Sequence, residues 1–572
     1  MASIVVNVHD YGTWVEDGAR VQCTFCDKRM NDFNRLKYHL GNVCKDVTPC
    51  SQVPLPIREA FFKMVMEQRY PDRKRGRSNK GFTASETAAE AEKLAQMDVA
   101  QFFYEHGVDF SAVDSTSFKK MMMIKTVGGE GGGQMIPDSR DLNGWMFQEA
   151  LKKVQDRVKE IKASWEITGC SILFDAWIGP KGRDLVTFVA DCPAGAVYLK
   201  SADVSDIKTD VTALTSLVNG IVEEVGVRNV TQIIACSTSG WVGDLGKQLA
   251  GQVFWSVSLS YCLKLMLVEI GKMYSFEDIF EKVKLLLDLI NNNPSFLYVF
   301  RENSHKVDVS SECEFVMPYL TLEHIYWVRR AGLFASPEWK KEQGIAISSF
   351  VNDSTFWESL DKIVGSTSSL VHGWLWFSRG SKHVAYAYHF IESIKKNVAW
   401  TFKYERQFYE PTWNVIDDVW HNNHNPLHAA GYFLNPMAYY SDDFHTYQHV
   451  YTGLAFSLVH LVKEPHLQVK IGTQLDVYRY GRGCFMKASQ AGQLNGVSPV
   501  NWWTQKANQY PELQNLAVKI LSQTSEGASR YKLKRSVAEK LLLTEGMSHC
   551  ERKHLEELAV VHYNLQLQSC KA

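Results

Sequence analysis

The sequence predicts a multidomain protein that combines an α/β core, an all-α part and a small metal-binding unit. Its 572 residues exceed the roughly 250 to 300 at which one hydrophobic core stops growing, so several domains are expected. Three β-rich apolar runs, a helical stretch and a fourth β-rich run follow one another within residues 141–255. Helical periodicity then dominates residues 256–425.

The beginning of the chain and its apolar runs argue against export and membrane insertion. The N-terminus lacks the charged, apolar and cleavage regions of a signal peptide. The most apolar windows are far shorter than the roughly 20 residues that span a bilayer. We therefore expect a soluble intracellular protein with no membrane partner. Its 12 cysteines would stay reduced, which favours metal ligands over disulfides.

Basic charge is concentrated near the N-terminus. Residues 1–80 hold 14 Lys/Arg against 9 Asp/Glu, whereas the whole chain has a net charge of -1. A phosphate-contacting module needs basic charge of this kind, although an ordinary solvated surface would also carry it. The run Arg73–Arg77 is typical of a nuclear localisation signal or a DNA-contacting arm, and a solvated linker is the alternative.

Residues 1–60 have the spacing of a zinc site. Cys23 and Cys26 are followed after twelve residues by His39 and after four more by Cys44. Two cysteines on a tight turn and a His/Cys pair from a following helix can complete a tetrahedron around Zn²⁺. Cys50 is a rival fourth ligand that spacing alone does not exclude. A unit this small would draw on the order of 10 kcal/mol or more of its folding free energy from the metal.

Basic side chains accompany the helix that we expect over residues 32–40. Arg35 and Lys37 lie on this helix, and Lys45 follows it. Lys and Arg at such positions can reach phosphates or guanine edges, which makes DNA the expected partner. Solvated helix charge is the alternative interpretation.

Residues 61–140 read as a basic linker with a helix over 86–106 and a glycine-rich loop at 128–133. Residues 141–255 form the first part of the core. Its expected elements are a helix (145–165), three strands (170–177, 185–192, 196–202), a helix (211–225), a strand (230–236) and a helix (242–249). This is the element order of the ribonuclease H-like fold, and it also fits many other α/β proteins.

Residues 256–425 are expected to form a helical insertion, and residues 426–572 return to the core. Within the last part, residues 497–567 are the expected dimerisation region. Apolar side chains there exceed what two short helices can hide by themselves, which predicts a homodimer. The residues concerned are Trp502, Trp503, Leu513 and Leu516, together with a helix over 553–567. Packing against the chain's own core is the alternative.

Several segments resemble one known family. Trp14, Cys23-x2-Cys26 and Arg35–Leu40, followed by Cys50–Pro54, resemble the BED-type zinc finger of plant hAT-superfamily transposases and of domesticated proteins derived from them. In related plant sequences the last cysteine lies in the register of Cys50. The resemblance therefore favours Cys50, whereas the spacing favours Cys44.

The resemblance extends over nearly the whole chain. Residues 169–177 and 199–206 look like the plant transposase-like domain of unknown function, DUF659. Segments in the last third resemble the hAT C-terminal dimerisation region, namely 426–436, 502–503, 521–524 and 561–565. The family implies a ribonuclease H-like core interrupted by a helical insertion, a DNA-binding finger and a C-terminal dimerisation region.

The residues that would cut DNA look incomplete. Such a core needs carboxylates that hold two Mg²⁺ ions, and Asp175 stands at the first family position. The second position aligns with Cys236, and a thiol is a poor ligand for a hard cation. The third falls near Lys532, and Glu526, the one carboxylate of that interval, is displaced. Asp175 is therefore interpreted as a relic, with no catalytic residues retained.

The leading hypothesis is a catalytically inactive, zinc-dependent, dimerising nuclear protein that binds DNA and regulates transcription. It would use no small-molecule substrate. An active hAT-type transposase or nuclease using Asp175 is one alternative, and a protein-interaction scaffold is another.

Overall fold

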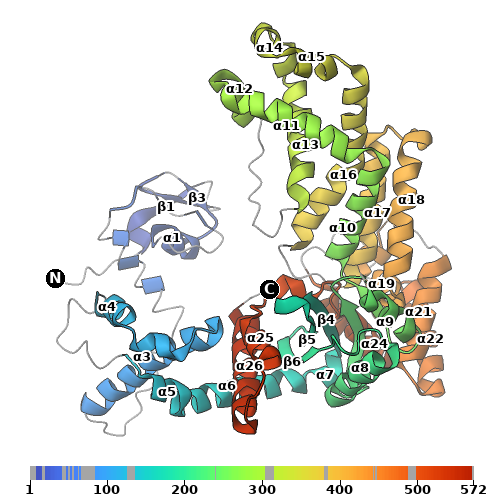
Figure 1. The fold of residues 1–572 in the computed structure, drawn as a ribbon. Helices are drawn as coiled ribbons and strands as arrows, with labels where there is room; N and C mark the ends of the chain where they lie inside the picture. The colour runs from blue at the N-terminus through green and yellow to red at the C-terminus, as the bar shows by residue number, and fades with distance from the viewer. Residues whose placement is uncertain are drawn as a thin grey trace. The chain divides into compact units, whose positions relative to one another are not determined.

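The computed structural model divides the chain into two compact units, Met1–Glu92 and Lys93–Ala572 (Figure 1). The structure describes residues 8–15, 20–26, 28–41, 47, 48, 50, 52–54, 57, 58, 60, 61, 64, 65, 84–124, 136–238, 240–302, 315–378, 384–441, 444, 448–486 and 497–569.

The N-terminal unit is a small antiparallel sheet packed on one helix. The sheet has the order β1-β2-β3, from Gly12–Val15, Arg20–Cys23 and Arg29–Met30, after a short 3-10 turn, η1 (Val8–Tyr11). Helix α1 (Phe33–Leu40) begins after Asp32, whose carboxylate accepts the Arg35 N–H and so caps the helix. Its buried Leu36 lies so close to the sheet that a Cβ at Gly12 would be 2.4 Å from it. The predicted helix over 32–40 is confirmed.

The second unit begins with helices that lead into a sheet. Their bounds are α3 (Ala84–His106), η3 (Phe110–Asp114), α4 (Thr116–Ile124), α5 (Ser139–Asn143), α6 (Trp145–Ala163) and α7 (Trp165–Thr168). Aromatic and aliphatic residues of α3, α6 and the C-terminal helix α26 (His549–Ser569) share one core. Tyr104 of α3 donates a hydrogen bond to the Leu142 carbonyl, which ties α3 to α5.

A five-stranded mixed sheet forms the α/β part, with the order β6-β5-β4-β7-β8. Its elements are β4 (Cys170–Ile178), η4 (Pro180–Gly182), β5 (Asp184–Cys192), β6 (Gly195–Asp203), α8 (Val211–Val225), β7 (Val230–Ala235), α9 (Trp241–Leu249) and β8 (Trp255–Val257). The first three strands pair antiparallel, whereas β7 pairs parallel to β4 and β8 parallel to β7. The four predicted strands and the three predicted helices, seen as α6, α8 and α9, occur in the predicted order, and β8 is additional.

The two faces of the sheet are covered by segments far apart in the sequence. Apolar residues of α8 and α9 pack on one face, as Leu214 and Leu245 do against Ile172 and Ile233. The opposite face packs on the C-terminal elements η8 (Ala528–Tyr531), α25 (Ser536–Leu543) and α26. Tyr198 of β6 stacks on Tyr563 of α26, with ring centroids 4.6 Å apart.

The predicted helical insertion, residues 256–425, begins within the short strand β8, and its other described elements are helices. Its elements are α10 (Leu259–Met273), α11 (Phe276–Asn292), α12 (Pro294–Glu302), α13 (Met317–Arg330), η6 (Leu333–Ala335), α14 (Pro337–Glu342), α15 (Ile345–Val351), α16 (Ser354–Ser378), α17 (Val384–Thr401) and α18 (Arg406–Asn423). One core lies among α11 to α16, with Trp339 fully buried in it. A second and larger core joins α10, α16, α17 and α18 to the helices that follow.

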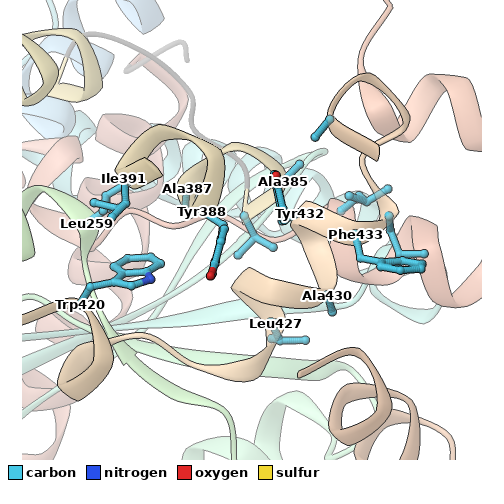
Figure 2. Close-up of a cluster of buried hydrophobic side chains, with 14 of the residues drawn as sticks. Leu259, Ala385, Ala387, Tyr388, Ile391, Trp420, Leu427, Ala430, Tyr432 and Phe433 are labelled. Carbon is cyan, nitrogen blue, oxygen red and sulfur yellow. The ribbon is translucent and has the colours of Figure 1, made fainter. Parts of the chain in front are cut away.

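Figure 2 shows part of this larger core, where Tyr388 and Ile391 of α17 face Trp420 of α18 and Tyr432 of α19. The helices that complete it are α19 (Pro426–Leu434), α20 (Pro436–Tyr439), α21 (Gln448–Leu461), α22 (Pro465–Arg479), η7 (Gly483–Phe485), α23 (Pro499–Lys506) and α24 (Pro511–Leu521). None of the helices in the described parts of the chain combines the length and the apolarity that crossing a bilayer requires.

The four residues expected at a dimer interface are instead buried inside the chain. Trp502, Trp503, Leu513 and Leu516 each have 4% of their surface exposed or less. The Trp503 indole N–H donates to the Leu434 carbonyl at 2.7 Å, so even its polar atom is satisfied internally. The reason is that α19 and α22 cover the two short helices, so these four side chains pack against the chain's own core.

Candidate metal centre and the Asp175 position

Four potential metal ligands converge in the N-terminal unit. The ligand atoms of Cys23, Cys26, His39 and Cys50 all lie within 4.8 Å of one another. Cys23 ends β2, Cys26 lies in the following turn, and His39 comes from the last turn of α1. Within the described residues this is the one group of three or more such side chains that lie so close together.

Backbone contacts orient the histidine toward the sulfurs. The Nδ1 atom of His39 lies 2.6 Å from the Thr48 carbonyl, to which it can donate its proton. Its Nε2 atom lies 3.1 Å from Cys26 Sγ and is thereby left to act as the ligand. The Cys50 N–H donates to the His39 carbonyl at 2.9 Å, which fixes the fourth side chain beside the others.

The donor set suits a tetrahedral metal ion. Zn–S and Zn–N bonds at tetrahedral angles separate ligand atoms by about 3.5–3.8 Å, which the cluster can meet with small side-chain shifts. Burial raises the pKa of the Cys26 thiol to about 11, so a bound cation is needed to keep a thiolate there at neutral pH. The cluster includes Cys50, whereas Cys44 lies outside the described residues. The site could therefore hold a metal ion through three sulfurs and one nitrogen.

The expected DNA-contacting residues are only partly described. Arg35 is exposed and Lys37 half-buried on α1, whereas Lys45 and the run Arg73–Arg77 lie outside the described residues. Trp14, which belongs to the segments that carry the resemblance, has 53% of its surface exposed. It lies edge-on to Phe33 with ring centroids 5.4 Å apart, because its strand position points it away from the core.

Asp175 and Cys236 lie side by side in the second unit. Asp175 is buried on the central strand β4, and Cys236 follows the neighbouring parallel strand β7. The Cys236 N–H donates to the Phe174 carbonyl at 3.1 Å, and its thiol hydrogen-bonds the Asp175 carboxylate. The structure thus brings together the two positions that the sequence comparison paired.

An arginine that the sequence analysis missed occupies the other side of Asp175. Arg535 Nη2 lies 2.7 Å from Asp175 Oδ2, and its guanidinium stacks 4.7 Å from the Trp177 ring centroid. Burial raises the pKa of Asp175, and the Arg535 charge opposes that shift. Burial and the nearby Asp175 carboxylate raise the pKa of the Cys236 thiol, which stays protonated at neutral pH. Arg535 follows Lys532 in the sequence, close to the position of the third carboxylate, and its basic charge there is the sequence feature that could have identified it.

The displaced carboxylate of Glu526 is engaged elsewhere. Its two oxygens accept the backbone N–H and the hydroxyl of Ser260, at 3.1 and 2.7 Å, at the start of α10. The next residue, Gly527, packs so tightly that a Cβ there would lie 2.6 Å from Cys236 Sγ. Arg530 then pairs with Asp191 at 2.7 Å. The contacts of Glu526, Gly527 and Arg530 fix the segment in which the family places its third carboxylate. Lys532, near that position, belongs to the same segment.

The residues around Asp175 do not fit a pair of Mg²⁺ ions. Hard cations prefer oxygen ligands, and the neighbours of this carboxylate are a protonated thiol and a guanidinium cation. Within the described residues, Asp175 shares no cluster of three or more metal-binding side chains.

Two family matches coincide with these structural parts. The family described as Domain of unknown function (DUF659) matches residues 137–286, from the start of α5 into α11, and so includes the whole five-stranded sheet. The hAT family C-terminal dimerisation region matches residues 474–565, from α22 into α26, which supports self-association. A comparison with curated proteins found no match. Together the two matches support a hAT-family transposase-like protein that contains a dimerisation region.

Proposed function

We propose that this chain is a zinc-containing nuclear protein, derived from a plant hAT transposase, that binds DNA as a dimer and regulates transcription without cutting. The observation that carries the proposal is the Asp175–Arg535 ion pair, because it places a fixed protein cation where DNA cleavage would require metal ions. Binding and assembly features are retained beside this altered position.

The strand arrangement favours a ribonuclease H-like core. Three consecutive antiparallel strands, a crossover helix and a fourth strand parallel to the first are the elements expected of that fold. Asp175 on the central strand then corresponds to the first carboxylate of such a core. Its present partners argue for a relic and against a working nuclease.

The N-terminal unit is the proposed DNA-binding module, a BED-type finger. Zn²⁺ held by Cys23, Cys26, His39 and Cys50 would fix α1 against the sheet. Arg35 is exposed on that helix, where a guanidinium can reach phosphate oxygens or a guanine edge. The basic run Arg73–Arg77 supports nuclear import or a further phosphate contact.

Cleavage is tested with supercoiled plasmid that carries ends typical of such transposons, incubated for hours with Mg²⁺ or Mn²⁺. We expect no nicking by the wild type and none by Cys236→Asp, because Arg535 and the missing third carboxylate remain. Nicking that disappears in Asp175→Ala would establish the active enzyme instead. Nicking that survives Asp175→Ala indicates a contaminant, and repurification must then remove it.

DNA binding is tested by fluorescence anisotropy of the full chain across a salt series. Arg35→Ala/Lys37→Ala should weaken binding about tenfold and lower the salt slope by up to about 2, since each phosphate contact contributes about 0.9. Lys340→Ala/Lys341→Ala, in the exposed part of α14, removes the same charge and should leave binding unchanged. Equal affinities for both variants and the wild type would favour a protein-interaction scaffold.

A further inference from the structure

We propose that a second copy of this chain docks on a double hollow around Lys519, formed by α7, α21, α22, α24 and the loop before β7. The inference rests on the proposed self-association and adds the surface through which the two copies contact each other. The residues first expected to form the interface are buried in the chain's own core, so the contact must use another face. The family match to a dimerisation region covers α24, whose residues line the second hollow and whose Lys519 lines both.

The surface consists of two adjacent cavities. One has a volume of about 480 Å³ and is lined by the loop before β7, by Phe254 and by the end of α21. The other has a volume of about 440 Å³ and lies among α7, α22 and α24. Leu461, Glu464 and Lys519 line both cavities and so form the ridge between them. Lys519 is fixed there, because its Nζ donates to the Arg228 carbonyl at 2.8 Å.

Both cavities carry apolar side chains that are exposed to solvent. Val227 in the first cavity is 67% exposed, and Ile167 in the second is 66% exposed. Leu467 and Ile471 add apolar lining to the second cavity. Phe254 in the first packs on His460, with ring centroids 4.5 Å apart. Such contiguous apolar surface with a charged rim is typical of protein contact sites.

The two cavities differ in charge, and this difference favours a second copy of the chain as the molecule that binds there. Besides Glu464 and Lys519, which line both, the first cavity is bordered by Arg228 and Lys463 and is basic. The second is bordered by Glu166 and Glu512 and is acidic, although Lys470 pairs with Glu512 at 2.6 Å. We place the two-fold axis of the dimer at the ridge between the cavities, where each cavity lies opposite the other cavity of the partner and the basic one faces the acidic one at both contacts. A nucleic acid would need basic charge across the whole surface. The charge pattern therefore fits a second copy of the chain.

Charge reversal tests this arrangement in the full-length protein by sedimentation velocity at micromolar concentration. Arg228→Glu/Lys463→Glu makes both cavities acidic, and Glu166→Lys/Asn515→Lys makes both basic. Each variant alone should be monomeric, with the dimer Kd raised about 100-fold or more, because like charges then face each other. An equimolar mixture of the two variants should recover the dimer, since opposite charges are restored at both contacts.

Two control variants match these changes outside the surface. Lys340→Glu/Lys341→Glu reverses the same number of charges on α14, and it should sediment as the wild type does. Ile167→Asp should weaken the dimer, whereas Ile345→Asp, at a side chain 91% exposed on α15, should not. Recovery in the mixture also shows that both reversed variants are folded.

The other outcomes separate the two proposals. A wild type that sediments as a monomer overturns self-association and this surface together. A dimeric wild type whose reversed variants also dimerise alone overturns the surface and leaves self-association standing. Monomeric variants whose mixture stays monomeric overturn the pairing of basic with acidic cavities.

Discussion

Asp175 shows how much one side chain can change a site. Its carboxylate remains on the central strand, but its neighbours supply a thiol hydrogen bond and a guanidinium charge. The ion pair compensates part of the cost of burying a charge on β4. Arg535 thereby becomes a structural requirement for the carboxylate that it neutralises.

Removing Arg535 should destabilise the second unit. In Arg535→Ala the Asp175 carboxylate stays buried without its cation, which should cost about 1–3 kcal/mol at pH 7, a value reduced for the partial exposure of Arg535. The cost should shrink on acidification, because the pKa of Asp175 is raised and the protonated form needs no cation. Urea unfolding at pH 7 and pH 5 measures both effects.

The control for this change is Arg552→Ala, at an exposed arginine of α26. The double variant Asp175→Asn/Arg535→Ala should recover part of the loss, because it removes both charges. Equal stability of Arg535→Ala and Arg552→Ala would show that the ion pair contributes nothing.

The identity of the fourth metal ligand, Cys50 or Cys44, can be tested by single substitutions. We expect one metal ion per wild-type chain, with Cys50→Ala lowering the metal content or affinity at least about tenfold, since one of four ligands is lost. Cys550→Ala, at an exposed cysteine of α26, is the matched control and should retain the metal. Elemental analysis of purified full chains decides the result, and retention in Cys50→Ala together with loss in Cys44→Ala would transfer the role to Cys44.

At the scale of elements, α19 depends on a buried histidine. Asn425 caps this helix, and neutral His428 Nδ1 accepts the Asn425 N–H in return, at 3.3 Å. Burial lowers the pKa of His428 to about 3. The helix, whose Leu427 and Ala430 Figure 2 shows in the core, therefore carries an uncharged imidazole at His428.

Acid should weaken this part of the protein. The unfolded chain binds a proton at His428 near pH 6.5 and the folded chain only near pH 3. The stabilisation is therefore present above pH 6.5 and is lost as the pH falls toward 3, by up to about 1.4 kcal/mol per pH unit. His428→Gln keeps a capping side chain and should flatten this dependence, whereas His549→Gln, at an exposed histidine, should not. Thermal unfolding between pH 7 and 4 compares them, and parallel curves for all three proteins would contradict the prediction.

Local sequence patterns predicted most elements, because each depends mainly on its own residues. The apolar β-rich run at 170–177 and the helix at 211–225 match β4 and α8 closely. The edge strand β8 was missed because three residues carry no periodicity. The burial of Trp503 was not predictable, because the helices that cover it, α19 and α22, are placed there by the tertiary fold. Cys50 was one of two candidates for the fourth ligand, and the structure brings it to His39. The pairing of Arg535 with Asp175 was not predictable, because the two residues are brought together only by the tertiary fold.

At the scale of the whole molecule, a buried polar network joins segments distant in sequence. Gln232 of β7 donates to Ser171 of β4 and to the Thr524 carbonyl, at 3.0 and 2.7 Å. It also accepts a hydrogen bond from Asn425, the residue that caps α19, at 3.1 Å. Ser171 in turn donates to Gln523 at 3.0 Å. Buried polar side chains of the sheet therefore find part of their hydrogen-bond partners in the C-terminal third of the chain.

The DUF659 match should consequently not fold as an isolated fragment. Residues 137–286 alone would leave the network incomplete and expose the sheet face that α25 and α26 cover. We expect circular dichroism of this fragment to show no cooperative unfolding, whereas residues 93–572 should unfold cooperatively. A fragment that melts as sharply as the longer chain would contradict this expectation.

The same network can be completed only late in the synthesis of the chain. Ser171 and Gln523 are separated by 352 positions, and ribosomes add about 5–20 residues per second, so about 20–70 s pass between their synthesis. During that interval one side of the sheet waits without its cover, and its apolar strands are open to aggregation. Chaperones that shield nascent β-structure should therefore matter more to the yield of this protein than the final stability of its sheet does.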